Sequence, residues 1–518
     1  MNRATAIGCV VAFFSTVLAA RGLAAGDFNG DGKDDLAVGS PQEEVDGMNL
    51  AGAVTVFYGT ASGITTALSH LFAERDFGAG FEPVEAALFG STLAIGDFDG
   101  DGFDDLAIGV PRTTVAGKVR AGAVDVLYGS AAGLTVARVQ RWTQATKGIA
   151  DKPEAIGDGV IVGEQFGTAL AAGDFDGDGK DDLAIGVLEG SKKRSRTGAV
   201  HVLRGSPSGL TAKRSQFWTQ NSAGVLGKAD QGDDFGAALA AGDWNGDTFD
   251  DLVIGVPGEE TYPGIHGAIA VLYGSKKGLR AKRNRLIGVL AAGGGDEATS
   301  QFGTALAAGD LNGDGKDDVA VGAPADYGAM GKVYAIYGGV HGLAIDDTTQ
   351  EKTPANDFSP GGVQLFTKYG AAVAIGDFDR DGRDDLAIGA PDRDTASQSG
   401  GRVTVLFGSP TGVGGAGANP TQVFSTDVGS IPGGTHTGLE FGAVLAAGDF
   451  DGDDVSDLAV GAPHALVSGL SGCGAAYILY GVDGGGLTDT GSQRFDESVP
   501  AVPGSPEASD AFGSAIGS

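Results

Sequence analysis

The chain has 518 residues, of which 92 are glycine, and a formal net charge of −32 at pH 7. This acidic excess argues against nucleic acid or an anionic membrane as the main partner and makes cations the natural counterpart. An apolar content of 42% argues against a disordered chain.

Residues 1–25 have the features of a secretory signal peptide. Arg3 gives a basic start, an apolar run extends from Ala6 to Ala20, and small residues suited to cleavage lie between Ala19 and Ala25. An uncleaved anchor is the alternative reading, although this run is short for a spanning helix. No later segment has the roughly 18 unbroken apolar residues that a membrane span requires. We therefore predict a secreted or cell-envelope protein, extracellular or periplasmic, with no membrane span in its mature part.

One acidic string, first seen as GDFNGDGKDDLAVG from Gly26, occurs seven times along the chain. Length alone predicts about three domains, but an internal repeat overrides that expectation. The copies lie 67 to 77 residues apart, so they mark one structural unit whose length changes fall in loops. Their first aspartates are Asp27, Asp97, Asp174, Asp243, Asp310, Asp377 and Asp449.

Each unit has further features around the acidic string. A small-residue turn follows the string, and then comes a glycine-bounded, β-branched stretch such as GAVTVFYG from Gly52. Such stretches are typical of strands, and about four of them in roughly 70 residues is the pattern of a propeller blade. Eight residues before the first aspartate stands an aromatic–glycine pair, namely Phe89-Gly90, Phe166-Gly167, Phe235-Gly236, Phe302-Gly303, Tyr369-Gly370 and Phe441-Gly442.

The combination of Phe-Gly, a DxDxDGxxD loop and a GAP turn, as at Gly322, Gly389 and Gly461, resembles the FG-GAP repeat. This repeat is the blade unit of the integrin α-subunit propeller and of many bacterial secreted proteins. The resemblance implies an all-β fold in which residues 26–518 form a seven-bladed β-propeller. Two departures stand out, because the third copy reads GVLEG in place of the GAP turn and the first copy has no upstream Phe-Gly pair.

A seventh aromatic–glycine pair, Phe512-Gly513, stands near the end of the chain with no acidic string after it. We expect this C-terminal strand to complete blade one and close the ring, which would remove free sheet edges. A truncated chain and a first strand supplied by residues 21–26 are the alternatives. Apart from the predicted signal peptide the chain contains a single cysteine, Cys473, so closure would not use an internal disulfide.

The acidic strings are candidate metal loops. In the first copy, positions 1, 3, 5 and 9 are Asp27, Asn29, Asp31 and Asp35, and position 7 is Lys33. Hard oxygen ligands in a flexible loop suit Ca²⁺ better than Mg²⁺. Position 7 varies in type, as expected if only its carbonyl binds. The same positions elsewhere are Asp97, Asp99, Asp101, Phe103 and Asp105; Asp174, Asp176, Asp178, Lys180 and Asp182; Asp243, Asn245, Asp247, Phe249 and Asp251; Asp310, Asn312, Asp314, Lys316 and Asp318; Asp377, Asp379, Asp381, Arg383 and Asp385; and Asp449, Asp451, Asp453, Val455 and Asp457.

Up to seven calcium ions are therefore expected, and two alternatives are disfavoured. An EF-hand needs glutamate at position 12, where the first copy has Val38, and it needs helical flanks. Merely solvated acidic turns would not keep the same spacing in all seven copies. The apolar position 2 should pack into the blade. Thr248 and Asp454 replace the position-6 glycine at a cost of about 1–2 kcal/mol for positive φ, so the fourth loop should be the weakest and the seventh the next.

No nucleophile elbow, zinc motif or phosphate loop is apparent, so we predict no catalytic residues and no enzyme activity. The integrin resemblance implies metal loops on one face and ligands on the opposite face, where length variation concentrates. There the basic SKKRSR of residues 191–196, with Tyr262, His266 and Tyr327 on comparable turns, could help to bind an acidic glycan or protein. The predicted function is a non-catalytic adhesion or ligand-binding module. The alternatives are a propeller-based carbohydrate-active hydrolase or lyase, and a purely structural surface protein.

Overall fold

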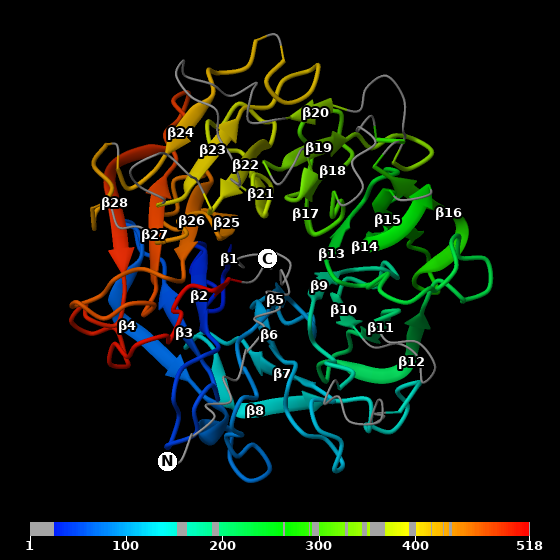
Figure 1. Ribbon diagram of the computed structural model, residues 1–518, viewed down its shortest axis with the longest axis horizontal. Coiled ribbons are helices and arrows are strands. Elements are labelled where there is room, and N and C mark those ends of the chain that lie inside the picture. Colours follow the sequence, from blue (N-terminus) through cyan, green and yellow to red (C-terminus); the bar gives the residue numbers. More distant parts are fainter. Residues whose placement is uncertain are drawn as a thin grey trace, which may run out of the picture.

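The computed structural model describes residues 25–516 except for 153–162, 189–195, 263–264, 290, 293–299, 327–329, 344–349, 353–367, 393–399, 416, 428 and 435–437. Seven antiparallel sheets stand around a ring, as the prediction of a seven-bladed β-propeller requires (Figure 1). In each blade the strands follow one another from the central channel outward. A short 3-10 turn, η1, lies at Glu74–Phe77 after β4.

Blade 1 contains β1 Ala25–Gly26, β2 Asp35–Ser40, β3 Ala53–Tyr58, β4 Thr65–Phe72 and β29 Ala515–Ile516; blade 2 contains β5 Leu93–Gly96, β6 Asp105–Val110, β7 Ala123–Tyr128 and β8 Thr135–Trp142; blade 3 contains β9 Leu170–Gly173, β10 Asp182–Val187, β11 Ala199–Arg204 and β12 Thr211–Trp218. Blade 4 contains β13 Leu239–Gly242, β14 Asp251–Tyr262, β15 Ile265–Tyr273 and β16 Arg280–Gly288; blade 5 contains β17 Ala305–Gly309, β18 Asp318–Ala323, β19 Lys332–Ile336 and β20 Gln350–Lys352. Blade 6 contains β21 Ala372–Gly376, β22 Asp385–Ala390, β23 Arg402–Leu406 and β24 Gln422–Phe424; blade 7 contains β25 Val444–Gly448, β26 Asp457–Ala462, β27 Ala475–Tyr480 and β28 Thr488–Phe495.

The second strand of each blade is buried along its whole length, except for the extended far end of β14 in blade 4, because both of its faces pack against neighbouring blades. This explains why segments such as DLAIGV in β6 and β10 are nearly continuous apolar runs. The outermost strands β4 and β8 are instead half exposed and carry polar residues. Most apolar clusters, such as the one that joins Val126 of β7 to Ile185 of β10, are shared by two adjacent blades. The core is therefore a ring of interfaces between blades.

The aromatic–glycine pairs join consecutive blades. Phe166 is fully buried and bridges to Gly122 at the start of β7, while Gly167 donates its amide to the carbonyl oxygen of Gly186 in β10 at 3.1 Å. A Cβ atom on Gly109 of β6 would lie 2.4 Å from the carbonyl oxygen of Gly167. The equivalent glycines of five other second strands approach the next blade as closely, so a side chain there would clash with its backbone; they are Gly39, Gly186, Gly255, Gly322 and Gly389.

Ring closure uses both ends of the described chain. β29 pairs with β2 through Ile516 and Val38, as predicted for a C-terminal strand, and the red end of the chain lies beside the blue β2 in Figure 1. β1 also pairs with β2, through Ala25 and Leu36. The two expectations for this strand are therefore both met in part, since the innermost position of blade 1 is shared between β29 and β1. Phe512 bridges to Gly474 in the way that Phe166 bridges to Gly122.

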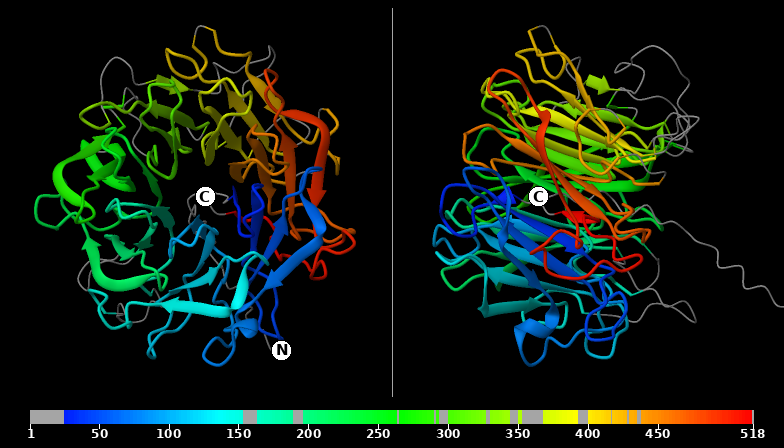
Figure 2. Two further views of the ribbon diagram at one scale, coloured as in Figure 1. Left: turned by 180° about the vertical axis from the view of Figure 1, so that it is seen from behind. Right: turned by 90° about the vertical axis from the view of Figure 1, so that its left-hand side faces the viewer.

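The innermost strands surround a narrow central channel (Figures 1 and 2). The channel contains a cavity of about 260 Å³ lined by alanine, leucine, valine and isoleucine side chains, among them Ala172, Leu239 and Ala308. Among the described residues that line this cavity, none has a charged or hydroxyl side chain.

Two sequence expectations concern the ends and the turns. Residues 1–24 lie outside the described part of the chain, so the signal peptide stays a prediction, and Ala25, its expected last residue, lies in β1. Tyr262 and His266 were expected on a turn but lie in β14 and β15, because this hairpin is extended by the pairing of Glu260 with His266. Tyr327 lies outside the described residues.

Candidate metal sites

Each acidic string forms the loop between the first and second strands of its blade. The position-1 aspartate organises the loop, as in blade 3, where Asp174 Oδ1 accepts the amides of Gly177 at 2.8 Å and Asp178 at 3.1 Å. Its Oδ2 accepts the amide of Gly179 at 2.8 Å. The same bonds recur at Asp97, Asp243, Asp310 and Asp449. This local network sets the tight turn from which the other oxygens project.

The position-9 aspartate lies buried at the base of the loop. Asp105 accepts the amide of Phe98 at 3.0 Å and that of Gly129, just after β7, at 2.9 Å. Burial raises the pKa of Asp105 to about 8, with a further rise from Asp99, although the backbone amides oppose the shift. A cation among these carboxylates would favour their ionised forms. The same residue therefore fastens the loop to the blade and adds acidic character beneath it.

The loops are of two kinds, according to position 3. Where that residue is aspartate, three carboxylates have oxygens within 4.8 Å of one another, in the groups Asp97, Asp99 and Asp101; Asp174, Asp176 and Asp178; Asp377, Asp379 and Asp385; and Asp449, Asp451 and Asp453. Where it is asparagine, the amide donates to the position-9 carboxylate, as Asn245 Nδ2 does to Asp251 Oδ2 at 2.9 Å. Asn29 and Asn312 make longer contacts of the same kind.

Arginine side chains enter two of the aspartate-type loops. In blade 3 the guanidinium of Arg204 lies 2.8 Å from Asp176 Oδ2 and 2.6 Å from Asp182 Oδ2, and it is almost fully buried. In blade 2, Arg138 contacts Asp99 Oδ2 at 2.5 Å from a more exposed position. A protein cation thus already neutralises part of the negative charge in these loops.

The position-7 side chain packs on the preceding loop, a role that its variation in residue type did not indicate. A Cβ atom on Gly177, at position 4 of the third loop, would lie 2.5 Å from the ring of Phe249, the position-7 residue of the next loop. Lys180 covers Gly100 in the same way. The position-7 side chain therefore shields the preceding loop, and successive loops are stacked around one face of the ring. Whether its carbonyl binds metal stays a prediction.

Positions 2 and 6 follow the sequence expectations. The position-2 side chains are fully buried, namely Phe28, Phe98, Phe175, Trp244, Leu311, Phe378 and Phe450. Thr248 and Asp454 have φ values of 70° and 64°, so they adopt the strained conformation expected where glycine is replaced. The predicted order of loop affinities is not tested by this geometry. Arg380, at position 4 of the sixth loop, adds a third strained residue with φ of 57°.

The FG-GAP repeat profile matches seven segments, residues 19–57, 89–127, 166–203, 235–271, 302–336, 369–406 and 441–479. The chain belongs to the FG-GAP repeat family. Each match contains one acidic loop and the two strands that follow it. The family therefore accounts for the repeated unit and for the ring that the structure describes.

Known relatives of this FG-GAP protein include integrin α chains. Integrin alpha-PS2 of Drosophila melanogaster is 35% identical over 237 residues, which cover 44% of this chain and 14% of the integrin. Human phosphatidylinositol-glycan-specific phospholipase D is 29% identical over 409 residues, which cover 75% of this chain and 45% of that protein. The chain thus spans less than half the length of either relative.

Solved structures show a weaker likeness. An exotype rhamnogalacturonan lyase covers 95% of this chain and is itself covered to 86%, with 13% identity and a TM-score of 0.41. This similarity is too low to bear on the function of the FG-GAP protein. Among the described residues, no helix has the length and apolar character needed to cross a membrane.

One functional position of the FG-GAP loop was missed in the sequence, the first aspartate of the DD doublet at position 8. Asp104 Oδ2 accepts the amide of Asp27 from the preceding blade at 2.9 Å, and Asp250 does the same for Asp174 at 2.8 Å. The clamp recurs at Asp34, Asp181, Asp317 and Asp384. In the seventh loop, position 8 is Ser456 instead of aspartate. The signal was the presence of Asp in six of seven copies at a position with no assigned ligand role.

A second omission is a basic run on the outer edge of blade 4. Residues 276–285 contain six lysine and arginine residues, so the SKKRSR segment is not the only dense basic cluster. Arg280 and Lys282 line two adjoining hollows that also reach Asp247 of the fourth FG-GAP loop. Of the SKKRSR segment only Arg196 is described, and it forms an ion pair with Asp234. Positive charge on the ring is thus found beside an acidic loop.

Proposed function

We propose that this protein is a secreted, calcium-binding β-propeller that acts as a non-catalytic adhesion or ligand-binding module outside the cell or in the cell envelope. The observation that carries the proposal is that the two faces of the ring differ, since the acidic loops all lie on one face. On one face the aspartates are engaged in building and stacking the acidic loops. The opposite face is left for a protein or glycan ligand.

Calcium is the proposed ion for the loops, with up to seven bound per chain. Four loops bring three carboxylates within reach of one ion, and hard oxygen ligands of this type suit Ca²⁺. Affinity should lie in the weak extracellular range, on the order of 0.1–1 mM. Elemental analysis after dialysis against calcium should count several ions per chain, and a count of zero would sink the assignment.

The opposite face carries apolar turn tips on three consecutive blades. Tight turns closed by the Val45–Met48, Val115–Lys118 and Val467–Leu470 bridges connect the second and third strands of blades 1, 2 and 7. Met48, Val119 and Leu470 are exposed there by 41%, 53% and 41%. Exposed apolar side chains at equivalent turns of adjacent blades form a contact surface suited to a ligand.

The test is saturable binding to a panel of extracellular glycans and matrix proteins, with turnover monitored in parallel. Met48→Asp combined with Val119→Asp should weaken the binding of a captured ligand at least tenfold. Val340→Asp is the matched control, because Val340 is 72% exposed in the turn after β19, on the side of the acidic loops. Equal effects of both variants would contradict the proposed face.

The alternative function is a propeller-based carbohydrate-active hydrolase or lyase. The phospholipase D relative and the lyase likeness do not favour it, because each concerns either part of a longer protein or a remote fold match. Release of product from a polysaccharide or glycolipid in the same panel, abolished by one clustered substitution, would replace the binding proposal with this one.

A further inference from the structure

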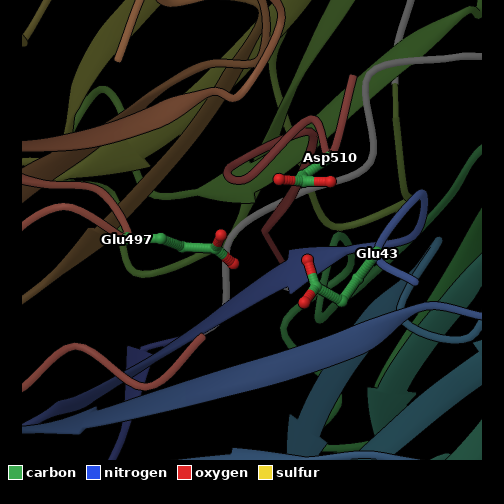
Figure 3. Close-up of side chains that lie close together, drawn as sticks. All are labelled: Glu43, Glu497 and Asp510. Atoms are coloured by element: carbon green, nitrogen blue, oxygen red, sulfur yellow. The ribbon is translucent and has the colours of Figure 1, made fainter. Parts of the chain in front are cut away.

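Three acidic side chains outside the seven loops converge where blade 7 meets blade 1. Glu43 lies in the turn after β2, Glu497 follows β28, and Asp510 stands two residues before Phe512 in the closing segment. Their carboxylate oxygens lie within 4.8 Å of one another, and Figure 3 shows Glu43 and Glu497 pointing toward each other with Asp510 beside them. They are buried, with exposures of 9%, 7% and 2%.

The cluster has acceptors without donors. Neither Oε1 nor Oε2 of Glu497 has a hydrogen-bond partner, and Oε2 of Glu43 has none either. Asp510 Oδ2 accepts the backbone amide of Glu507. Burying carboxylates without compensating partners is costly, so these side chains need a cation or a proton among them. Burial raises the pKa values of all three groups, with a further rise for Glu43 and Glu497 from repulsion within the cluster and for Asp510 from the neighbouring Glu507.

At the equivalent place between blades 3 and 4, a neutral amide takes the position of one carboxylate and donates a hydrogen bond to another. Glu259 stands eight residues after the position-9 aspartate, as Glu43 does, and Asp233 stands two residues before Phe235, as Asp510 does before Phe512. The third member, two residues after the last strand of the preceding blade, is Gln220, whose Nε2 donates to Glu259 Oε2 at 2.6 Å. At the junction of blades 7 and 1 this amide is replaced by the carboxylate of Glu497.

We propose that Glu43, Glu497 and Asp510 form an additional divalent-cation site, with Ca²⁺ as its ion, distinct from the seven acidic loops. Three carboxylates supply hard, negatively charged oxygens without rigid octahedral geometry, which favours Ca²⁺ over Mg²⁺. The site lies on the side of the ring opposite the loops, because Glu43 follows the far end of β2. A bound ion would tie the closing segment 496–512 to the turn 41–52 and so reinforce ring closure.

The decisive variant is Glu497→Gln, which recreates the arrangement of Gln220 and Glu259 and should therefore fold. Calcium counted by elemental analysis after equilibrium dialysis should fall by one ion per chain relative to the parent protein. The matched control is the reverse change, Gln220→Glu, which should create a second such cluster and raise the count by one. In EGTA the Glu497→Gln variant should melt at a higher temperature than the parent.

Hydrogen exchange locates the ion. Calcium should slow amide exchange in residues 41–52 and 496–512 of the parent protein but not of Glu497→Gln. An unchanged calcium count in the variant would overturn the proposal and would leave a proton shared between Glu43 and Glu497 as the explanation. A variant that loses an ion but keeps calcium-dependent protection of 41–52 would also overturn it, because the lost ion would then come from elsewhere.

Discussion

Blades 3 and 4 are neighbours with the same order of strands, yet their third strands place different side chains in the interior. The third strand of blade 3 carries His201 and ends in Arg204, whereas that of blade 4 has Ala270 and ends in Tyr273. Arg204 lies among the loop carboxylates, and the pKa of Asp182 is raised to about 7, less than the value of about 8 for Asp251 in blade 4. The fold therefore tolerates a buried charge where acidic residues supply its partner.

The largest expected effect is that of removing calcium. A loop saturated at 100 times its Kd gains about 2.7 kcal/mol, so two such loops already contribute about 5 kcal/mol. Thermal unfolding in EGTA should occur well below the temperature found in calcium. Amide exchange should rise more in residues 243–251 than in 174–182, because the third loop keeps the buried guanidinium of Arg204 between two carboxylates, whereas in the fourth loop the more exposed Arg280 reaches only Asp247, at 3.6 Å. An equal rise in amide exchange in both loops would show that Arg204 does not stabilise the third loop in the absence of calcium.

Replacing Arg204 by the tyrosine found in blade 4 should turn blade 3 into a more calcium-dependent blade. The change leaves Asp176 and Asp182 without their buried partner, which costs about 3–5 kcal/mol in the absence of metal. The melting temperature of Arg204→Tyr in EGTA should therefore fall, while in excess calcium the difference from the parent should narrow. A loss of equal size under both conditions would show that Arg204 acts through packing alone.

Acid should weaken blade 3 more than blade 4. Both ring nitrogens of His201 are buried without a hydrogen-bond partner, and burial lowers the pKa of His201 to about 3. Because the pKa of His201 is lower in the folded protein than in the unfolded chain, this residue leaves the free energy of unfolding unchanged above pH 6.5. As the pH falls toward 3 the free energy of unfolding decreases, by about 2 kcal/mol at pH 5. The stability difference between pH 7.5 and pH 5 should shrink in His201→Ala and grow in Ala270→His, measured by urea unfolding.

The smallest expected effect concerns position 6 of the two loops. Thr248 has φ of 70°, whereas the equivalent Gly179 has φ of 81°, and a Cβ atom at Gly179 would meet no other atom within 4 Å. Thr248→Gly should relieve about 1 kcal/mol of backbone strain, partly offset by the greater entropy of glycine in the unfolded chain. Gly179→Thr is the matched reverse change. A calcium titration of both variants would then show whether strain at position 6 makes the fourth loop the weakest.

Much of the fold was predictable because each unit repeats its own local signals. The alternating small and β-branched residues predicted the strands, and the spacing of aspartates located every loop. The missing Phe-Gly pair before the first loop and the extra pair at Phe512-Gly513 predicted closure by β29. The contribution of β1 to the same innermost position required the structure, because a two-residue strand has no distinctive pattern.

The candidate sites were predictable only in part, since their partners come from neighbouring blades. Position 8 looked like one more acidic residue until Asp104 was seen to accept the amide of Asp27, 77 residues away. Arg204 gave no hint in sequence that it enters the third loop, because its partners Asp176 and Asp182 lie more than 20 residues before it. Both contacts join segments that the chain brings together only when the blades form.

The sequence by itself determined the number of blades, the places of the seven loops and their oxygen-rich chemistry, because these depend on local spacing within each repeat. Only the tertiary structure decided which loops receive an arginine, how each loop is clamped to the next, and that Glu43, Glu497 and Asp510 share one buried place. The physical reason is that these contacts join residues distant in sequence, which meet only when the strands form a blade, when successive blades pack together, or when the ring closes.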